Sequence, residues 1–291
     1  MRPEIIACAR EHVPGVGPVA IEAIAGGEVN ETFRVEREGR AYSLRVGRPA
    51  AAELELDRAF ECRVLAVAAT AGIAPPVKRC EPERRILVLD WQAGRRWSPT
   101  EARTPANLAR IGELVRRVQA LAVPQPVERH ISAWIAHYGR LGAGTLERHP
   151  HILEHRAALE RILEALAQLP SAPPLLCHGD LHCENLIETA EGLRLIDWEY
   201  AHLADPLWDL AAWASDLDLD AEAVMRLLHA WRGRPPQALE LERLELLRWL
   251  YEYLCLLWSV ITGVRAAAGA ETITVLAARL RRGVSGRGAQ T

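Results

Sequence analysis

The chain has 291 residues, 49% of them hydrophobic and 25% charged, so it can form one large domain or two modest ones around a substantial apolar core. The formal net charge of −3 offers no basic face for nucleic acid and no polybasic signal for a membrane surface. The first 14 residues include charged side chains and lack an apolar signal core, and the six cysteines are scattered, as is typical of reduced thiols. We therefore expect a cytoplasmic protein that binds neither nucleic acid nor membrane, and a homodimer is left open.

Short runs of apolar and β-branched residues predict strands in the first third of the chain. They cover residues 19–25, 32–35, 41–46 and 86–89. Residues 50–71 have helical spacing and are followed by Gly72 and Pro75-Pro76, which stop helices. This part is predicted to form an antiparallel sheet with one helix.

Helical spacing dominates the rest of the chain. It covers residues 101–121 and 152–169 and nearly everything after residue 206, while short strands are expected at 175–177 and 193–196. The apolar run 249–264 is short for a membrane span and carries Glu252, so a buried core helix is expected. The sequence predicts an α+β protein with an N-lobe, residues 1–90, and a mainly helical C-lobe, residues 91–291.

The most informative motif is HGDLHCEN at residues 178–185, between the two short strands. Phosphoryl transfer needs a carboxylate beside the attacking hydroxyl and an amide oxygen on the metal, and Asp180 and Asn185 have the five-residue interval of a kinase catalytic loop. Asp197 follows 12 residues later, at the end of an apolar strand, where a kinase places a second ligand for Mg²⁺. The pair of motifs predicts an ATP- and Mg²⁺-dependent kinase with a protein-kinase-like two-lobed fold.

Two other interpretations of this loop are open. Asp and Asn are common in polar turns, where their side chains cap the backbone. Cys177, His178, His182 and Cys183 also form a dense group that resembles a zinc site, although the Cys-x-x-Cys step of zinc sites is absent. We expect the two histidines to shape the loop by hydrogen bonds.

Nucleotide binding is expected in the N-lobe. Gly26, Gly27 and Asn30 lie between two predicted strands, where backbone amides can approach phosphates, although a plain hairpin turn would have the same composition. Adenine is expected against the backbone of residues 89–92, which makes Asp90 and Gln92 candidates for its site.

A kinase also needs a cation on its third strand, paired with a Glu on the following helix. Lys78 is the only lysine and lies after that helix, so Arg45 on the third predicted strand is the candidate cation. Its expected partner is Glu61 in the middle of the helix, whereas Asp57 and Arg58, one turn earlier, are expected to be solvated.

These residues resemble the aminoglycoside phosphotransferase and choline kinase superfamily, and the resemblance covers most of the chain. The HGDLH motif with Asn185 is similar to its phosphotransferase signature, and Arg45 falls where the choline kinase branch often has Arg. The resemblance implies a kinase that phosphorylates a hydroxyl of a small-molecule acceptor. The stretches LIDWEYA (195–201) and DPLWDLA (205–211) look most like bacterial choline kinases, while thiamine kinases share the first of them.

The acceptor is expected to be a small cationic alcohol such as choline or ethanolamine. Glu199, Trp213 and Trp258 are the candidate contacts, because aromatic faces and carboxylates attract ammonium groups. Cys255 stands where the family often has a Trp of the acceptor site, and the aromatic residues have helical spacing that equally fits a core. The alternatives are a thiamine kinase, an aminoglycoside phosphotransferase or a nucleotide-binding pseudokinase.

Overall fold

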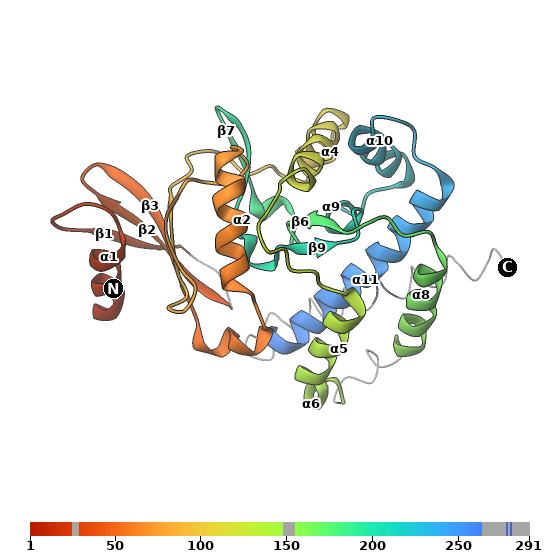
Figure 1. The fold of residues 1–291 in the computed structure, drawn as a ribbon, viewed down its shortest axis with the longest axis horizontal. Helices are drawn as coiled ribbons and strands as arrows, with labels where there is room; N and C mark the ends of the chain where they lie inside the picture. The colour runs from red at the N-terminus through yellow and green to blue at the C-terminus, as the bar shows by residue number, and fades with distance from the viewer. Residues whose placement is uncertain (25–28, 148–154, 264–277, 279, 281–291) are drawn as a thin grey trace. The chain divides into compact units, whose positions relative to one another are not determined.

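A computed structural model describes residues 1–24, 29–147, 155–263, 278 and 280 (Figure 1). The chain divides into two compact units. Unit 1 contains Met1–Ser98, Leu121–Pro126 and Cys183–Ala201, and unit 2 contains Pro99–Ala120, Val127–His182 and His202–Thr291. Unit 1 thus takes in a late segment that the sequence prediction assigned to the C-lobe. The lobe boundary at residue 90 stays a prediction.

Unit 1 is built on a five-stranded antiparallel sheet in the order β1-β2-β3-β5-β4. The strands are β1 (Ala20–Ile24), β2 (Asn30–Arg37), β3 (Arg40–Gly47), β4 (Val77–Glu81) and β5 (Ile86–Asp90). Helix α1 (Pro3–His12) packs its buried residues Ile5 and Ala9 into a core cluster with Phe33, Leu44 and Val88 of the sheet. Apolar side chains on alternate strand positions therefore form one buried face.

The single helix predicted over residues 50–71 is wrong at its start. A 3₁₀ turn, η1 (Pro49–Leu54), comes first, and α2 (Arg58–Thr70) begins only after Asp57, whose carboxylate accepts a 2.8 Å hydrogen bond from the backbone N–H of Phe60. An N-cap of this kind starts a new helix because it satisfies an amide that no helical carbonyl can reach. The predicted stop at Gly72, with φ +66°, is confirmed.

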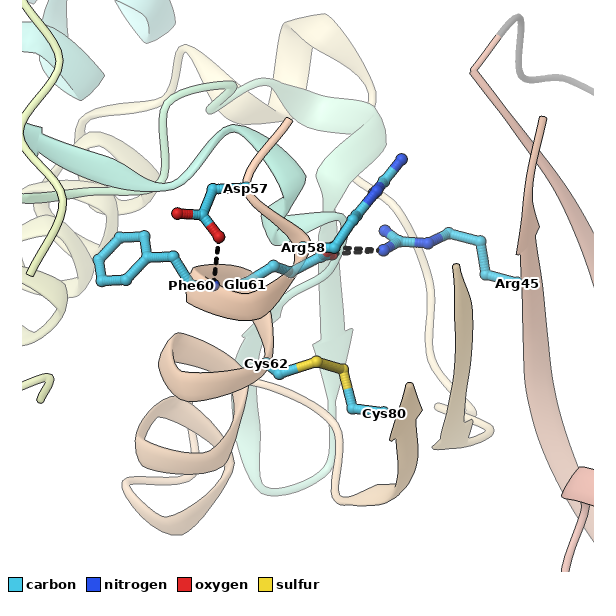
Figure 2. The surroundings of a disulfide bond; sticks show 7 residues. All are labelled: Arg45, Asp57, Arg58, Phe60, Glu61, Cys62 and Cys80. Atoms are coloured by element: carbon cyan, nitrogen blue, oxygen red, sulfur yellow. Dashed lines mark hydrogen bonds and ion pairs between the residues drawn. A yellow bond between two sulfur atoms is a disulfide. The ribbon is translucent and has the colours of Figure 1, made fainter. Parts of the chain in front are cut away.

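Two cysteines of unit 1 form a disulfide, so the expectation of reduced thiols is wrong for them. Figure 2 shows Cys62 of α2 bonded to Cys80 of β4, with their Cα atoms 5.9 Å apart. The 18-residue separation gave no signal for this pair, because the contact depends on how the helix packs against an edge strand that the sequence did not predict. Cys8, Cys177 and Cys255 keep free thiols.

Unit 2 is mainly helical. Its helices are α3 (Pro99–Ala102), α4 (Pro105–Gln119), α5 (Ile131–Leu141), α6 (Ala143–Leu146), α8 (Arg156–Gln168), α9 (Trp208–Asp216), α10 (Ala221–Arg232) and α11 (Ala238–Gly263). Helix α4 packs along α10, and α11 contacts α5, α8 and α9 (Figure 1). Strands β6 (Leu175–Cys177) and β9 (His202–Ala204) pair in a two-stranded antiparallel ladder. In the sequence, β6 ends directly before the HGDLHCEN motif, and β9 follows Ala201.

The run 249–264 was predicted to be a buried core helix, and residues 249–263 lie inside α11. Trp249, Leu250 and Leu257 of this stretch are at most 3% exposed. Within the described residues, no helix has the length and apolar character needed to cross a bilayer.

Candidate active site

A short hairpin in unit 1 brings Asn185 and Asp197 together. Strands β7 (Leu186–Thr189) and β8 (Gly192–Leu195) pair antiparallel, so the residues just before and just after the hairpin become neighbours. The backbone N–H of Ile196 donates a 3.0 Å hydrogen bond to the carbonyl of Asn185. Asp197 adopts φ +61°, a left-handed conformation that Asp tolerates better than most side chains and that is often found at functional sites.

Asn185 and Asp197 line a cavity of about 550 Å³ that lies wholly in unit 1. Leu87, Leu89 and Ile187 give the cavity apolar walls, and Trp91 and Thr32 add further contacts. A mostly apolar hollow with a few polar groups at one end is typical of a nucleotide or cofactor site.

The predicted adenine segment also lines this cavity. Both Asp90 and Gln92 are among its wall residues. The carboxylate of Asp90 is paired with Lys78 at 2.9 Å, and the Gln92 amide donates to the Asp90 carbonyl. Asn30 lies on the same wall, whereas Gly26 and Gly27 fall outside the described residues.

The expected ion pair between Arg45 and Glu61 is present (Figure 2). The Arg45 guanidinium on β3 donates to both carboxylate oxygens of Glu61 on α2, at 2.6 and 2.5 Å, and to Asp197 Oδ1 at 2.9 Å. Burial alone would lower the pKa of Arg45, but the carboxylates of Glu61, Glu199 and Asp197 together raise it above its ordinary value. The side chain therefore stays charged where it lines the cavity.

Arg58 is not solvated, which corrects the sequence prediction. Its side chain is 13% exposed and donates to Glu199 at 2.6 Å, to Glu61 at 3.1 Å and to Asn30 at 3.0 Å. Asp57, predicted to be solvated as well, is half-buried and caps α2. The error for Arg58 arises because charge alone cannot tell an exposed helix start from one packed against another segment.

Glu199 lies in this same cluster. Its side chain is 3% exposed, and its carboxylate accepts from Asn30 at 2.5 Å and from Arg58. A buried carboxylate that accepts two hydrogen bonds is suited to a structural role, so these contacts disfavour the predicted contact of Glu199 with a cationic acceptor. That acceptor role stays a prediction.

The chemistry of the donors fits a magnesium ion. Asn185 and Asp197 present hard oxygen atoms, and Mg²⁺ binds proteins through one or two such side chains while phosphate oxygens and water complete its shell. In the described part of the chain, no three His, Cys, Asp or Glu side chains are grouped as a metal site. Cys177, His178, His182 and Cys183 are thus not arranged as a set of metal ligands in this structure.

The part of the HGDLHCEN motif that lies in unit 2, residues 178–182, is held by a buried carboxylate that sequence reasoning missed. Asp209, 0% exposed on α9, accepts hydrogen bonds from the backbone N–H groups of His178 at 2.7 Å and Gly179 at 3.0 Å. Gly179 has φ +87°, a conformation that few other residues adopt readily. Asp180 follows with a partly exposed side chain, and His182 Nε2 lies 3.2 Å from its Oδ2, so His182 does shape the loop.

Burial raises the pKa of Asp209 to about 6. The hydrogen bonds from Gly179 and His178 lower this pKa, and the negative charge of Asp180 raises it further. Asp209 belongs to the DPLWDLA stretch, which was quoted only for its resemblance to choline kinases. Asp209 can hold the loop only because α9 packs against it, and no sequence pattern near Asp209 indicates this contact.

Two side chains of helix α11, Tyr251 and Cys255, have pKa values that the charge of Asp180 helps to raise. Burial raises the pKa of Cys255 to about 12, with Asp180 as the next cause, and burial raises the pKa of Tyr251 with Cys255 and Asp180 as further causes. Of the predicted acceptor residues in unit 2, Trp258 on α11 is half-buried and Trp213 on α9 is 0% exposed. Trp213 therefore fills the core here, and its acceptor role stays a prediction.

The sheet with its buried Arg–Glu pair, and the hairpin that presents an amide and a carboxylate, define the protein as kinase-like in fold. A model of the phosphotransferase enzyme family matches residues 20–268. The chain belongs to that family.

Curated relatives match shorter segments. LicA of Haemophilus influenzae is 33% identical over 91 residues, 29% of this chain and 34% of that protein. Thiamine kinase of Escherichia coli O1:K1 is 46% identical over 48 residues, 16% of this chain and 18% of that enzyme. The matched segments thus span about a third of LicA and less than a fifth of thiamine kinase.

Solved structures are similar over nearly the whole chain. A choline/ethanolamine kinase family protein from Mesorhizobium loti has a TM-score of 0.74 at 25% identity, covering 96% of this chain and 94% of that one. Choline kinase LicA from Streptococcus pneumoniae has a TM-score of 0.75 at 18% identity, covering 97% and 98%. An ADP-bound aminoglycoside phosphotransferase has a TM-score of 0.65 at 15% identity, covering 95% and 97%. The fold is that of protein-kinase-like small-molecule phosphotransferases, as predicted.

Proposed function

We propose that this protein is an ATP- and Mg²⁺-dependent kinase that phosphorylates a hydroxyl of a small cationic alcohol. The observation that carries this proposal is the pair Asn185 and Asp197, held side by side on the wall of a 550 Å³ cavity that Arg45 also lines. An amide, a carboxylate and a buried arginine at one end of an apolar hollow match what a nucleoside triphosphate and its metal require.

The nucleotide would lie in the cavity of unit 1. Its base would contact the apolar side chains Leu87 and Leu89 and the backbone of residues 89–92. Arg45 would meet the phosphates, because a guanidinium can bond phosphate oxygens bidentately while it keeps its contact with Glu61. Asn185 and Asp197 would hold Mg²⁺, which neutralises charge on the phosphates when bound.

Asp180 would orient the acceptor hydroxyl and take its proton. The hydroxyl oxygen then forms a bond to the γ-phosphorus, the bond to the β-γ bridging oxygen breaks, and ADP leaves with the electron pair. His182, 3.2 Å from the Asp180 carboxylate, would fix its direction, and Asp209 would hold the loop through the backbone of His178 and Gly179.

The acceptor class is inferred from resemblance and from the aromatic residues of unit 2. The Mesorhizobium loti neighbour is titled a choline/ethanolamine kinase family protein, which favours choline or ethanolamine. The 46% identity to thiamine kinase over 48 residues keeps thiamine as a second candidate. Cytoplasmic location and a homodimer remain expectations.

The test is a panel of choline, ethanolamine, thiamine, kanamycin and homoserine with ATP and Mg²⁺, read by ADP release. Choline or ethanolamine should give the highest kcat/KM, and Trp258→Ala should raise KM for that amine more than KM for ATP. A clear preference for homoserine would defeat the cationic-alcohol assignment. Nucleotide binding without turnover of any acceptor would favour a pseudokinase.

A further inference from the structure

Arg58 joins three segments of unit 1 that the proposed function uses separately. It lies in the first turn of α2, and its guanidinium reaches Glu61 of the same helix, Glu199 in the segment after β8, and Asn30 at the start of β2. All of these contacts are 3.1 Å or shorter, and the four side chains are largely buried. Charge-assisted bonds of this length in a buried setting fix geometry.

The two arginines of this cluster have different surroundings. Arg45 lines the cavity and contacts Asp197, the proposed metal ligand, whereas Arg58 is not a wall residue of the cavity and bonds Glu199 instead. Arg45 approaches Glu199 only to 3.6 Å. The bonds of Arg58 to Glu61 and Glu199, neither of which is a wall residue, therefore do not have to break when a ligand enters the cavity.

Two arginines of the cluster, Arg45 and Arg58, contact the three carboxylates of Glu61, Asp197 and Glu199. On nucleotide binding, Arg45 is expected to turn toward phosphate and Asp197 toward a cation. Arg58 then remains as the guanidinium that holds both Glu61 and Glu199.

We propose that Arg58 is a positioning residue for Mg²⁺-nucleotide binding. By tying Glu199 and Asn30 to Glu61 on α2, it sets the position of Asp197, two residues before Glu199, relative to Arg45. The inference rests on the proposed function, but it concerns a residue that the ligands themselves need not touch.

The test compares Arg58→Ala and Arg58→Lys with Arg63→Ala, a matched loss of charge on the same helix outside the cluster. The probe is ADP, titrated calorimetrically with and without Mg²⁺, alongside KM for ATP and for the acceptor and the melting temperature. In Arg58→Ala the affinity for Mg²⁺-ADP should fall at least tenfold, while affinity for metal-free ADP and KM for the acceptor should change less than threefold. Arg58→Lys should recover part of the loss, and Arg63→Ala should bind within twofold of the wild type.

A second variant separates positioning from plain stability. Arg58→Ala leaves Glu199 buried with one partner fewer, so it should lower the melting temperature, and Arg58→Ala with Glu199→Gln removes that charge. The double variant should regain most of the melting temperature and still bind Mg²⁺-ADP weakly.

The outcomes are distinct. If the double variant regains wild-type affinity together with stability, Arg58 only neutralises Glu199 and the inference is overturned. Unchanged Mg²⁺-ADP affinity in a folded Arg58→Ala overturns it as well and leaves the proposed function standing. A wild type that binds no Mg²⁺-ADP overturns the proposed function, and this inference falls with it.

Discussion

Of all single residues, Asp180 has the most direct proposed task, the removal of the acceptor proton. Asp180→Asn keeps the size of the side chain and its place beside His182 but removes the basic oxygen. Turnover should fall by about 10²–10⁴-fold, the usual range for loss of general-base or orienting assistance. Steady-state kinetics measures this fall, and calorimetry should show Mg²⁺-ADP affinity within twofold of the wild type.

The control for that variant is Asp218→Asn, the same change at an exposed residue of unit 2. It should retain wild-type kinetics. Wild-type turnover in purified Asp180→Asn would remove Asp180 from the mechanism.

Asp209 predicts a pH dependence of stability. Its pKa is about 6 in the folded protein and near 3.8 in an unfolded chain, so between these values the folded state holds a proton that the unfolded state has released. The free energy of unfolding should therefore decrease as pH rises from 4 to 6, by up to about 3 kcal/mol from this group, and should then level off. Urea unfolding of the wild type and Asp209→Asn at several pH values measures the difference.

The informative quantity is the stability of the wild type minus that of Asp209→Asn. It should shrink across this window and stay constant above about pH 6.5. A difference independent of pH would mean that Asp209 ionises as an ordinary carboxyl group.

The sequence singles out Asp180, Asn185 and Asp197 because they stand at the intervals that phosphoryl transfer requires, and their roles stay predictions. Residues that act through a partner could not be singled out in this way. Apart from the bond between Arg58 and Glu61, the bonds of Arg58 and Asp209 described here are made with residues more than 25 positions away and leave no local pattern.

At the scale of elements, the disulfide between α2 and β4 should contribute to stability. It closes a separation of 18 residues, and the entropy that this removes from the unfolded chain corresponds to about 3 kcal/mol. Cys62→Ser with Cys80→Ser should lower the free energy of unfolding by about that amount under oxidising conditions. Chemical denaturation with and without a reductant measures it.

Cys8→Ser is the control, because Cys8 is a free thiol of the same unit. The reductant should lower the stability of the wild type and of Cys8→Ser equally, and should leave the double variant unchanged. Equal stability of wild type and double variant in the absence of reductant would show that the disulfide does not form in the purified protein.

Elements with alternating or periodic apolar patterns were predictable, and elements defined by neighbours were not. Strands β2 and β3 carry buried side chains in such patterns, β5 is a continuous buried apolar run, and all three were expected. The edge strand β4 has mixed polar residues and pairs with β5 alone, and the break between η1 and α2 depends on one capping carboxylate.

At the scale of the whole molecule, the family match over residues 20–268 and the similar structures agree with the motifs on a small-molecule phosphotransferase fold. The acceptor is harder to predict because it depends on side chains of separate helices. The charge of Asp180 helps to raise the pKa values of Tyr251 and Cys255 on α11, whereas Trp213 on α9 is fully buried. Aromatic composition alone did not distinguish a ligand contact from a core residue.

The proposed metal requirement belongs to this scale too, since Asn185 precedes and Asp197 follows one hairpin, and its strand pairing brings both residues to the cavity wall. Asn185→Ala and Asp197→Ala should shift the Mg²⁺ midpoint of turnover at least tenfold higher while the melting temperature changes little. An unchanged metal titration in both variants would place the metal elsewhere.

The most direct test of the proposed kinase activity follows the phosphoryl group itself. The protein is incubated with Mg²⁺, the best acceptor of the panel and ATP labelled with ¹⁸O at the non-bridging γ-oxygens, and the product is analysed by mass spectrometry. Labelled phosphate attached through the acceptor's own unlabelled oxygen is expected, and Asp180→Asn should form it far more slowly. Labelled inorganic phosphate as the sole product, or no nucleotide turnover with any acceptor, would contradict phosphoryl transfer to an alcohol.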